Sequence, residues 1–223
     1  IGEDRLRMLR AVRFAARLGF TIEPHTFAAI RAHAAAITVV SWERIGDEIL
    51  RILTDGAAER GLRLLDESGL LAPLLPEVAA MKTVEQSPDF HPEGDVFTHT
   101  LLLLRQLPAG SSQTLALAAL LHDVAKGECA ARRPDGRITF YGHAEIGAER
   151  ALAICQRLRR SRETWETVAW LVRHHLRLAS APQMRRSTLR RFLAEPHIDE
   201  LLELGRMDAL ASHGDLTAYE FCR

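Results

Sequence analysis

The feature that most constrains this fold is an apolar run, Leu115 to Leu121, that leads directly into the pair His122-Asp123. The run is typical of a buried helix, yet a core helix has little reason to end in two adjacent polar side chains. Burying an unpaired carboxylate is costly, so the pair needs a charged partner. A divalent cation is one such partner, because imidazole and carboxylate groups are both good ligands for it.

Further candidates for the same site lie on both sides of this pair, most of them near the end of an expected helix. They are His99, His143, His174, His175 and Asp208. Each histidine alone is more often structural or exposed than a ligand, because histidine has many uses. Facing helices of a bundle can bring such side chains into one cavity. The set as a whole therefore predicts a metal centre, with Lys126 one turn after His122.

The rest of the chain predicts an all-α fold. Apolar residues recur at three- and four-residue intervals, and no segment alternates convincingly at period two. The segment 129–140 is basic and contains Gly and Pro, so we expect a loop there, with a short extended piece at 138–140. The main helices are expected at 2–18, 24–37, 42–54, 57–67, 96–106, 115–126, 143–158, 165–176, 187–193 and 198–211.

A polar stretch with Pro88, Pro92 and Gly94 interrupts the helical pattern. We place a boundary there, between a small helical module at residues 1–85 and a helical bundle at 86–223. No apolar run reaches the length of a membrane span. The chain begins at Ile1, inside a charged helical pattern, so we expect a piece of a longer protein.

Charge and cysteine content exclude few classes of function. Lys plus Arg and Asp plus Glu both number 29, so only local clustering could favour nucleic acid. The three cysteines are far apart, which fits a reducing compartment such as the cytoplasm. Arginines recur along the first helix at Arg7, Arg10, Arg13 and Arg17. They form either a solvated face with intrahelical ion pairs or a face that contacts phosphates and bases.

The order of the histidines and aspartates resembles the HD phosphohydrolase superfamily, whose signature is a metal-bound His, His-Asp and distal Asp. The resemblance implies metal-assisted hydrolysis of a phosphate ester, in which Asp123 orients a water molecule and Lys126 neutralises phosphate charge. His143, and one of His174 or His175, would bind a second metal or the substrate phosphate. The metal could be Mg, Mn, Ni or Fe among others. The primary ligands that it implies are His99, His122, Asp123 and Asp208.

The N-terminal stretch resembles the Glu-Asp-x-x-Arg motif of bacterial tRNA nucleotidyltransferases (CCA-adding enzymes) and related poly(A) polymerases. Glu3, Asp4 and Arg7 match the motif, and Arg10 and Arg13 match arginines that follow it. In that family the Asp and Arg pair with the base of CTP or ATP. The resemblance implies a neck or RNA-binding module at 1–85, an HD domain at 86–223, and tRNA or another RNA 3′ end as partner.

The polymerase head of that family, with its Gly-Ser motif and paired carboxylates, has no match in these 223 residues. We therefore expect no nucleotide addition by this chain and a CTP or ATP site only in a full-length protein. An exposed neck without its head could also self-associate as a homodimer.

Three functions remain open at this point. The first is a working phosphohydrolase that acts on 2′,3′-cyclic phosphates or phosphomonoesters, as at RNA ends. The second is a metal-loaded but non-catalytic tRNA-binding module. The third is a stand-alone HD hydrolase of nucleotides, against which the Glu-Asp-x-x-Arg match argues.

Overall fold

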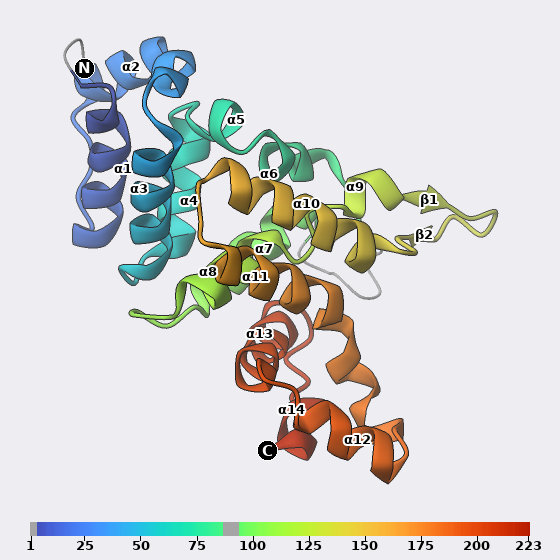
Figure 1. Ribbon diagram of the computed structural model, residues 1–223. Helices are drawn as coiled ribbons and strands as arrows, with labels where there is room; N and C mark the ends of the chain where they lie inside the picture. The colour runs from blue at the N-terminus through green and yellow to red at the C-terminus, as the bar shows by residue number, and fades with distance from the viewer. Residues whose placement is uncertain (1–3, 87–93) are drawn as a thin grey trace.

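The structure is a computed structural model that describes residues 4–86 and 94–223 (Figure 1). Within these residues nearly all regular structure is helical, which confirms the all-α class. The N-terminal part contains, in chain order, α1 (Leu6–Leu18), α2 (Pro24–His33), the 3₁₀ helix η1 (Ala34–Val39), α3 (Trp42–Thr54), α4 (Ala58–Glu67), α5 (Leu71–Leu74), α6 (Pro76–Ala80) and the 3₁₀ helix η2 (Met81–Thr83).

The C-terminal part is also helical, apart from a small hairpin. Its strands pair antiparallel within the segment expected to be a loop, and the second of them lies where a short extended piece was expected. The elements are α7 (Val96–Arg105), α8 (Gln113–Leu121), α9 (Lys126–Cys129), β1 (Ala131–Arg132), β2 (Ile138–Thr139), α10 (His143–Arg157), α11 (Arg162–His174), the 3₁₀ helix η3 (His175–Gln183), α12 (Arg186–Leu193), α13 (Ile198–Ala211) and α14 (Thr217–Cys222).

Local side chains set several helix ends. Gly19 ends α1 in the left-handed conformation, with φ of 70°, which glycine adopts without a steric penalty. The Ser112 hydroxyl caps α8 by accepting from the Leu115 amide at 3.1 Å. Ser41 stands at the start of α3, but its side chain makes no capping hydrogen bond, although serine is a preferred residue at this position. The helix expected over 24–37 is α only to His33 and continues as a 3₁₀ helix.

Helix α8 is the centre of the fold. Every residue from Leu115 to Leu121 is buried, because α8 packs against α3 of the N-terminal part and against α7, α11 and α13. A helix that is apolar all round needs such an enclosure. The turn that follows α8 therefore emerges inside the molecule, and that turn carries the His-Asp pair.

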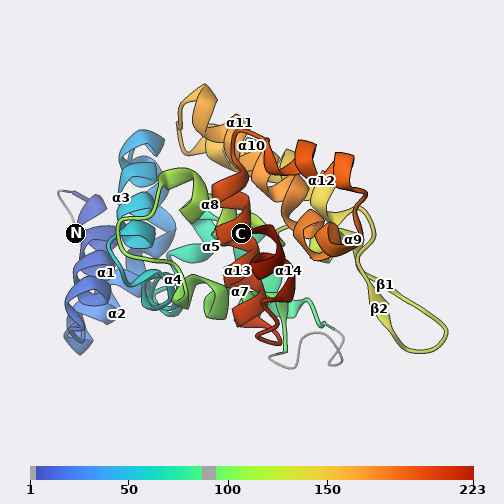
Figure 2. The same cartoon turned by 90° about the horizontal axis from the view of Figure 1, so that it is seen from below.

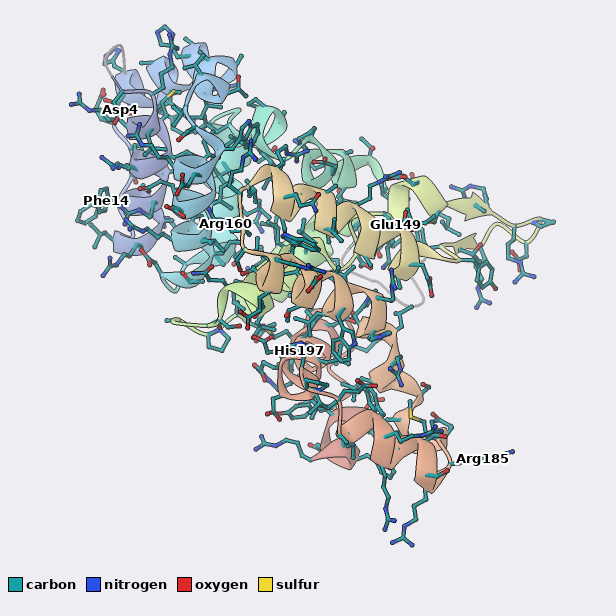
Figure 3. The ribbon with its side chains drawn as sticks, in the orientation of Figure 1. Asp4, Phe14, Glu149, Arg160, Arg185 and His197 are labelled. Atoms are coloured by element: carbon teal, nitrogen blue, oxygen red, sulfur yellow. The ribbon has the colours of Figure 1, made fainter. Side chains whose placement is uncertain are left out.

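The two parts of the chain share one continuous apolar core. Ion pairs also join them: Arg157 donates two hydrogen bonds of 2.7 Å to Glu77, and Arg160 donates one of 2.9 Å to Asp47. Figure 3 shows Arg160 between α3 and the α10–α11 turn. Two arginines of the basic cluster at 157–162 thus hold the N-terminal part against the bundle.

The molecule has three extremities. Helices α1 to α4 form one end, the β1–β2 hairpin projects from another side, and α12 and α14 lie at a third (Figures 1 and 2). No helix in residues 4–86 or 94–223 is long and apolar enough to cross a membrane.

The packing of α3 on the bundle yields a stability prediction. A Cβ at Gly46 would run into the backbone carbonyl oxygen of Leu158 and the Arg160 guanidinium. Overpacking of this kind costs about 1–3 kcal/mol, which outweighs the helix propensity that alanine gains over glycine. We expect Gly46→Ala to lower the free energy of unfolding by about 1–2 kcal/mol, measured by urea denaturation.

The control for this variant is Arg51→Ala, since Arg51 lies on the exposed face of the same helix. It should change stability by less than about 0.5 kcal/mol. A Gly46→Ala protein as stable as the parent would show that α3 does not pack against the Leu158 backbone as described.

Candidate metal centre and adjoining pocket

Five side chains converge on one buried point. His99 comes from α7, and His122 and Asp123 lie in the turn after α8, because the helix expected over 115–126 ends at Leu121. His143 is the first residue of α10, and His175 is the first residue of η3. All five side chains are buried, although they are separated by up to 76 residues in sequence.

The Asp123 carboxylate lies at the middle of this cluster. Its Oδ2 atom is 3.1 Å from His122 Nε2 and 4.0 Å from His99 Nε2. Its Oδ1 atom is 3.4 Å from His143 Nε2 and 3.8 Å from His175 Nε2. Two groups of potential metal ligands therefore share Asp123: one contains His99 and His122, the other His143 and His175.

Backbone carbonyls orient three of the histidine rings. The Nδ1 atoms of His122, His143 and His175 lie 3.1, 2.7 and 2.6 Å from the carbonyl oxygens of Ala119, Phe140 and Val172. A carbonyl oxygen can only accept, so each Nδ1 carries the hydrogen. In the neutral rings the Nε2 lone pairs then point at the cluster. This is the usual arrangement of metal-bound histidines, whose second nitrogen donates to a fixed acceptor.

The inward nitrogens of these three rings find no protein donor among residues 4–86 and 94–223. His143 Nε2 and His175 Nε2 face each other at 3.3 Å, so two lone pairs meet unless a cation or proton lies between them. Burial lowers the pKa of His175 to about 4, which disfavours the proton. His122 Nε2 is buried without a hydrogen-bond partner in the same described ranges. A set of imidazole and carboxylate donors arranged in this way fits a divalent cation.

Asp208 on α13 contacts the first ligand group through His99, from the more exposed side of the cluster. Its Oδ1 atom is 2.9 Å from His99 Nε2, and about a third of its side chain is exposed. Burial opposes ionisation of this carboxyl, but the hydrogen bond with His99 and the electrostatic effect of the nearby His122 outweigh it and hold the pKa of Asp208 below its usual range. The carboxylate is thus charged at neutral pH, as a metal ligand must be.

Lys126 also reaches the central carboxylate. Its ammonium lies 2.8 Å from Asp123 Oδ2 and donates to Gln86 Oε1 at 2.7 Å. Burial raises the pKa of Asp123, but His122 and Lys126 act in the opposite direction and hold it well below the usual value. Asp123 is therefore an anion surrounded by basic groups. No sequence signal pointed to Gln86, since a single amide 40 residues upstream carries no motif.

The structure separates the two adjacent histidines. His175 belongs to the second ligand group, whereas His174 lies outside both groups and packs edge-on against the Trp170 ring, with 4.8 Å between ring centroids. The structure therefore brings His175, and not His174, to the ligand groups. The reason is geometric: successive side chains on a helix point about 100° apart, so His174 and His175, at the junction of α11 and η3, face different surroundings.

Asp4, one of the expected nucleotide-contacting residues, lies just before α1, at the end of the molecule formed by α1 to α4 (Figure 3). Asp4 forms a 3.0 Å ion pair with Arg44, and Glu3 lies outside the described residues. Arg7 lies on the exposed side of α1.

Arg10 and Arg13 both form ion pairs with an acidic residue of α3. Both approach Glu48, at 3.4 and 2.8 Å, and Arg13 also lies 3.6 Å from Asp55. Arg13 is only 8% exposed, and its ion pair with Glu48 holds α1 against α3. Ion pairs to the neighbouring helix α3 thus account for part of the arginine stripe.

A pocket of about 680 Å³ adjoins the metal centre. His143 belongs both to its lining and to the cluster, and Lys126, which contacts Asp123, also lines it. Arginines line it from two sides, and two aromatic residues lie between the hairpin and α10. These residues, which no sequence motif had indicated, are Arg133, Arg137, Phe140, Tyr141, Arg173 and Arg177. The basic character of the segment 129–140 was the available signal.

Comparison with known protein families identifies both parts of the chain. Residues 19–82 match the family described as a probable RNA and SrmB-binding site of polymerase A. Residues 95–212, more than half of the chain, match the HD domain family. The residues of the cluster described above all fall within the second match.

Curated relatives are tRNA nucleotidyltransferases. The CC-adding enzyme of Thermus thermophilus is 38% identical over 95% of this chain, and the A-adding enzyme of Deinococcus radiodurans is 37% identical over 95%. A multifunctional CCA protein of Halorhodospira halophila is 36% identical over 84%. The chain spans about half the length of these relatives. The similar identities do not favour one addition specificity over another.

Family matches and relatives agree with the ligand geometry. The C-terminal residues match an HD domain, and the preceding residues match an RNA-binding region. The chain therefore belongs to the HD domain family and is a homologue of the tRNA nucleotidyltransferases that carry such a domain.

Proposed function

We propose that this chain is a divalent-metal-dependent phosphohydrolase acting on phosphate esters at the ends of RNA. The observation that carries the proposal is the position of the Asp123 carboxylate between two groups of histidines whose Nε2 atoms face inward. A purely structural cluster would pair these nitrogens with donors. The adjoining pocket supplies the space that a substrate needs.

The residues that would hold the metal fall into two sets that share Asp123. His99, His122 and Asp208 would serve one side, and His143 and His175 the other. A divalent cation bound there supplies Lewis-acid activation of a water molecule and of the phosphoryl group. The donor set is compatible with Mg, Mn, Ni or Fe, because imidazole and carboxylate ligands accept each of them.

Substrate phosphate would enter from the pocket side. Lys126 is placed to neutralise its charge, because the ammonium lies at the junction of pocket and cluster. His143 occupies the same junction, where it can bind metal or contact the phosphate. Asp123 remains anionic at neutral pH and can accept a hydrogen bond from an attacking water, which orients that water.

The RNA context comes from the comparisons. An RNA-binding region precedes the HD domain, and the relatives are named for adding nucleotides to tRNA. We therefore propose 2′,3′-cyclic phosphates or phosphomonoesters at RNA ends as substrates, tRNA as the partner and the cytoplasm as the location. Nucleotide addition with CTP and ATP would belong to a longer protein that includes a polymerase head. The neck and HD modules would meet near residues 85–86.

The adjacent histidines provide a matched test of the metal centre. His175→Ala should reduce Mn²⁺ affinity by more than about 100-fold, because removing even a secondary hydrogen-bond partner costs 10–100-fold. His174→Ala should bind Mn²⁺ like the parent, since His174 lies outside both ligand groups. Metal content and isothermal titration measure both. An equal decrease in the two variants, or none in either, would contradict the assignment.

Lys126 provides a separate test of turnover. Lys126→Met removes the charge at the pocket junction, and we expect kcat toward bis-p-nitrophenyl phosphate to fall by about 10²–10³-fold with Mn²⁺ still bound. Lys82→Met is the control, because that lysine pairs with Asp66 on the exposed surface. Full activity in Lys126→Met would exclude the proposed role, and absence of turnover in metal-loaded parent protein would favour a non-catalytic metal site.

A further inference from the structure

We infer that the pocket beside the metal centre binds a single-stranded RNA end through at least one phosphate in addition to the phosphate that reacts. This inference rests on the proposed hydrolase function for the reacting phosphate. It adds a binding site for a second backbone phosphate and names residues outside the metal cluster that would form it.

The pocket carries more positive charge than one phosphate requires. Arg133 approaches from the β1–β2 hairpin, whereas Arg173 and Arg177 approach from the end of α11 and from η3. None of the three has a carboxylate within 4.0 Å in residues 4–86 and 94–223. Glu145 is the acidic residue in the pocket lining. Arginines held together without acidic partners are suited to an anionic ligand, and their planar fork matches phosphate.

The reacting phosphate already has partners. Lys126 and the metal centre lie at the inner end of the pocket and would satisfy it. Arg133 and Arg173 are exposed, line the pocket from the hairpin and from α11, and lie outside the ligand cluster. With a ligand that carries only the reacting phosphate, these two guanidinium groups would have no anionic partner. A ligand with a further phosphate along its backbone would bring the second negative charge to them.

Two aromatic side chains also line the pocket. Tyr141 is 80% exposed, and Phe140 is half-buried with the Lys126 ammonium 5.4 Å from its ring centroid. Exposed aromatic rings beside arginines are what unpaired bases stack on in single-stranded RNA recognition. The volume of about 680 Å³ is within the range of pockets that enclose ligands of nucleotide size. Rings and arginines together favour an RNA end over an inorganic polyphosphate.

A first experiment compares two substrates that differ by one nucleotide. With Mn²⁺ present, kcat/KM is measured for 2′,3′-cyclic AMP and for a dinucleotide that ends in a 2′,3′-cyclic phosphate. We expect the dinucleotide to be preferred at least about 10-fold, equivalent to 1.4 kcal/mol. In Arg133→Ala/Arg173→Ala the ratio should fall toward one. In the control Arg162→Ala, at the far end of α11 in an ion pair with Glu166, the ratio should persist. Equal rates on both substrates in the parent would overturn the inference.

A second experiment needs no turnover. Anisotropy of a fluorescent single-stranded oligoribonucleotide measures binding to the chain in EDTA at several salt concentrations. The double variant should bind more weakly, and its slope of log K against log salt should fall by about 0.7 for each phosphate that the protein no longer neutralises. Binding that depends on these arginines without any hydrolysis would refute the hydrolase proposal alone. An unchanged slope, or ATP competing as well as unlabelled RNA, would refute the pocket assignment.

Discussion

The burial of one carboxylate organises this molecule. Asp123 is 2% exposed, and an anion in that position requires several positive or hydrogen-donating neighbours. Helix α8 brings it there, because its uniformly apolar surface is stable only when other helices cover every side. Among the residues that face Asp123, His99 lies on the enclosing helix α7, whereas His143 begins α10 and His175 directly follows α11. The segments that cover the apolar surface of α8 thus also place the polar side chains around Asp123.

Hydrogen bonds to the backbone fix the histidine rings of the cluster in an orientation suited to metal binding. The Nδ1 atoms of three histidine rings donate to backbone carbonyl oxygens. For His122 and His175 these carbonyls lie in the last turn of α8 and of α11. Their inward nitrogens cannot turn away without breaking these bonds. Such preorganisation distinguishes a ligand set from a chance gathering of histidines, in which the rings would find donors of their own.

The N-terminal part supports this centre indirectly. Arg157 and Arg160 hold α3 and α6 against α10 and the turn before α11, and the same α3 also packs on α8. A region matched to an RNA-binding family is thus structurally continuous with the HD domain. Arg10 and Arg13, which the sequence pattern suggested as nucleotide contacts, contribute mainly to the α1–α3 interface through Glu48.

The sequence by itself determined the helical class, most helix positions and the set of residues from which the centre is built, because apolar periodicity and the His-Asp pair at the end of a buried run are local signals. Only the tertiary structure decided that His175 and not His174 joins the cluster, that Gln86 holds Lys126, and that arginines of a hairpin and of α11 line one pocket. These outcomes depend on helix ends and on contacts between segments 30 or more residues apart. Spacing along the chain does not encode where two such segments meet.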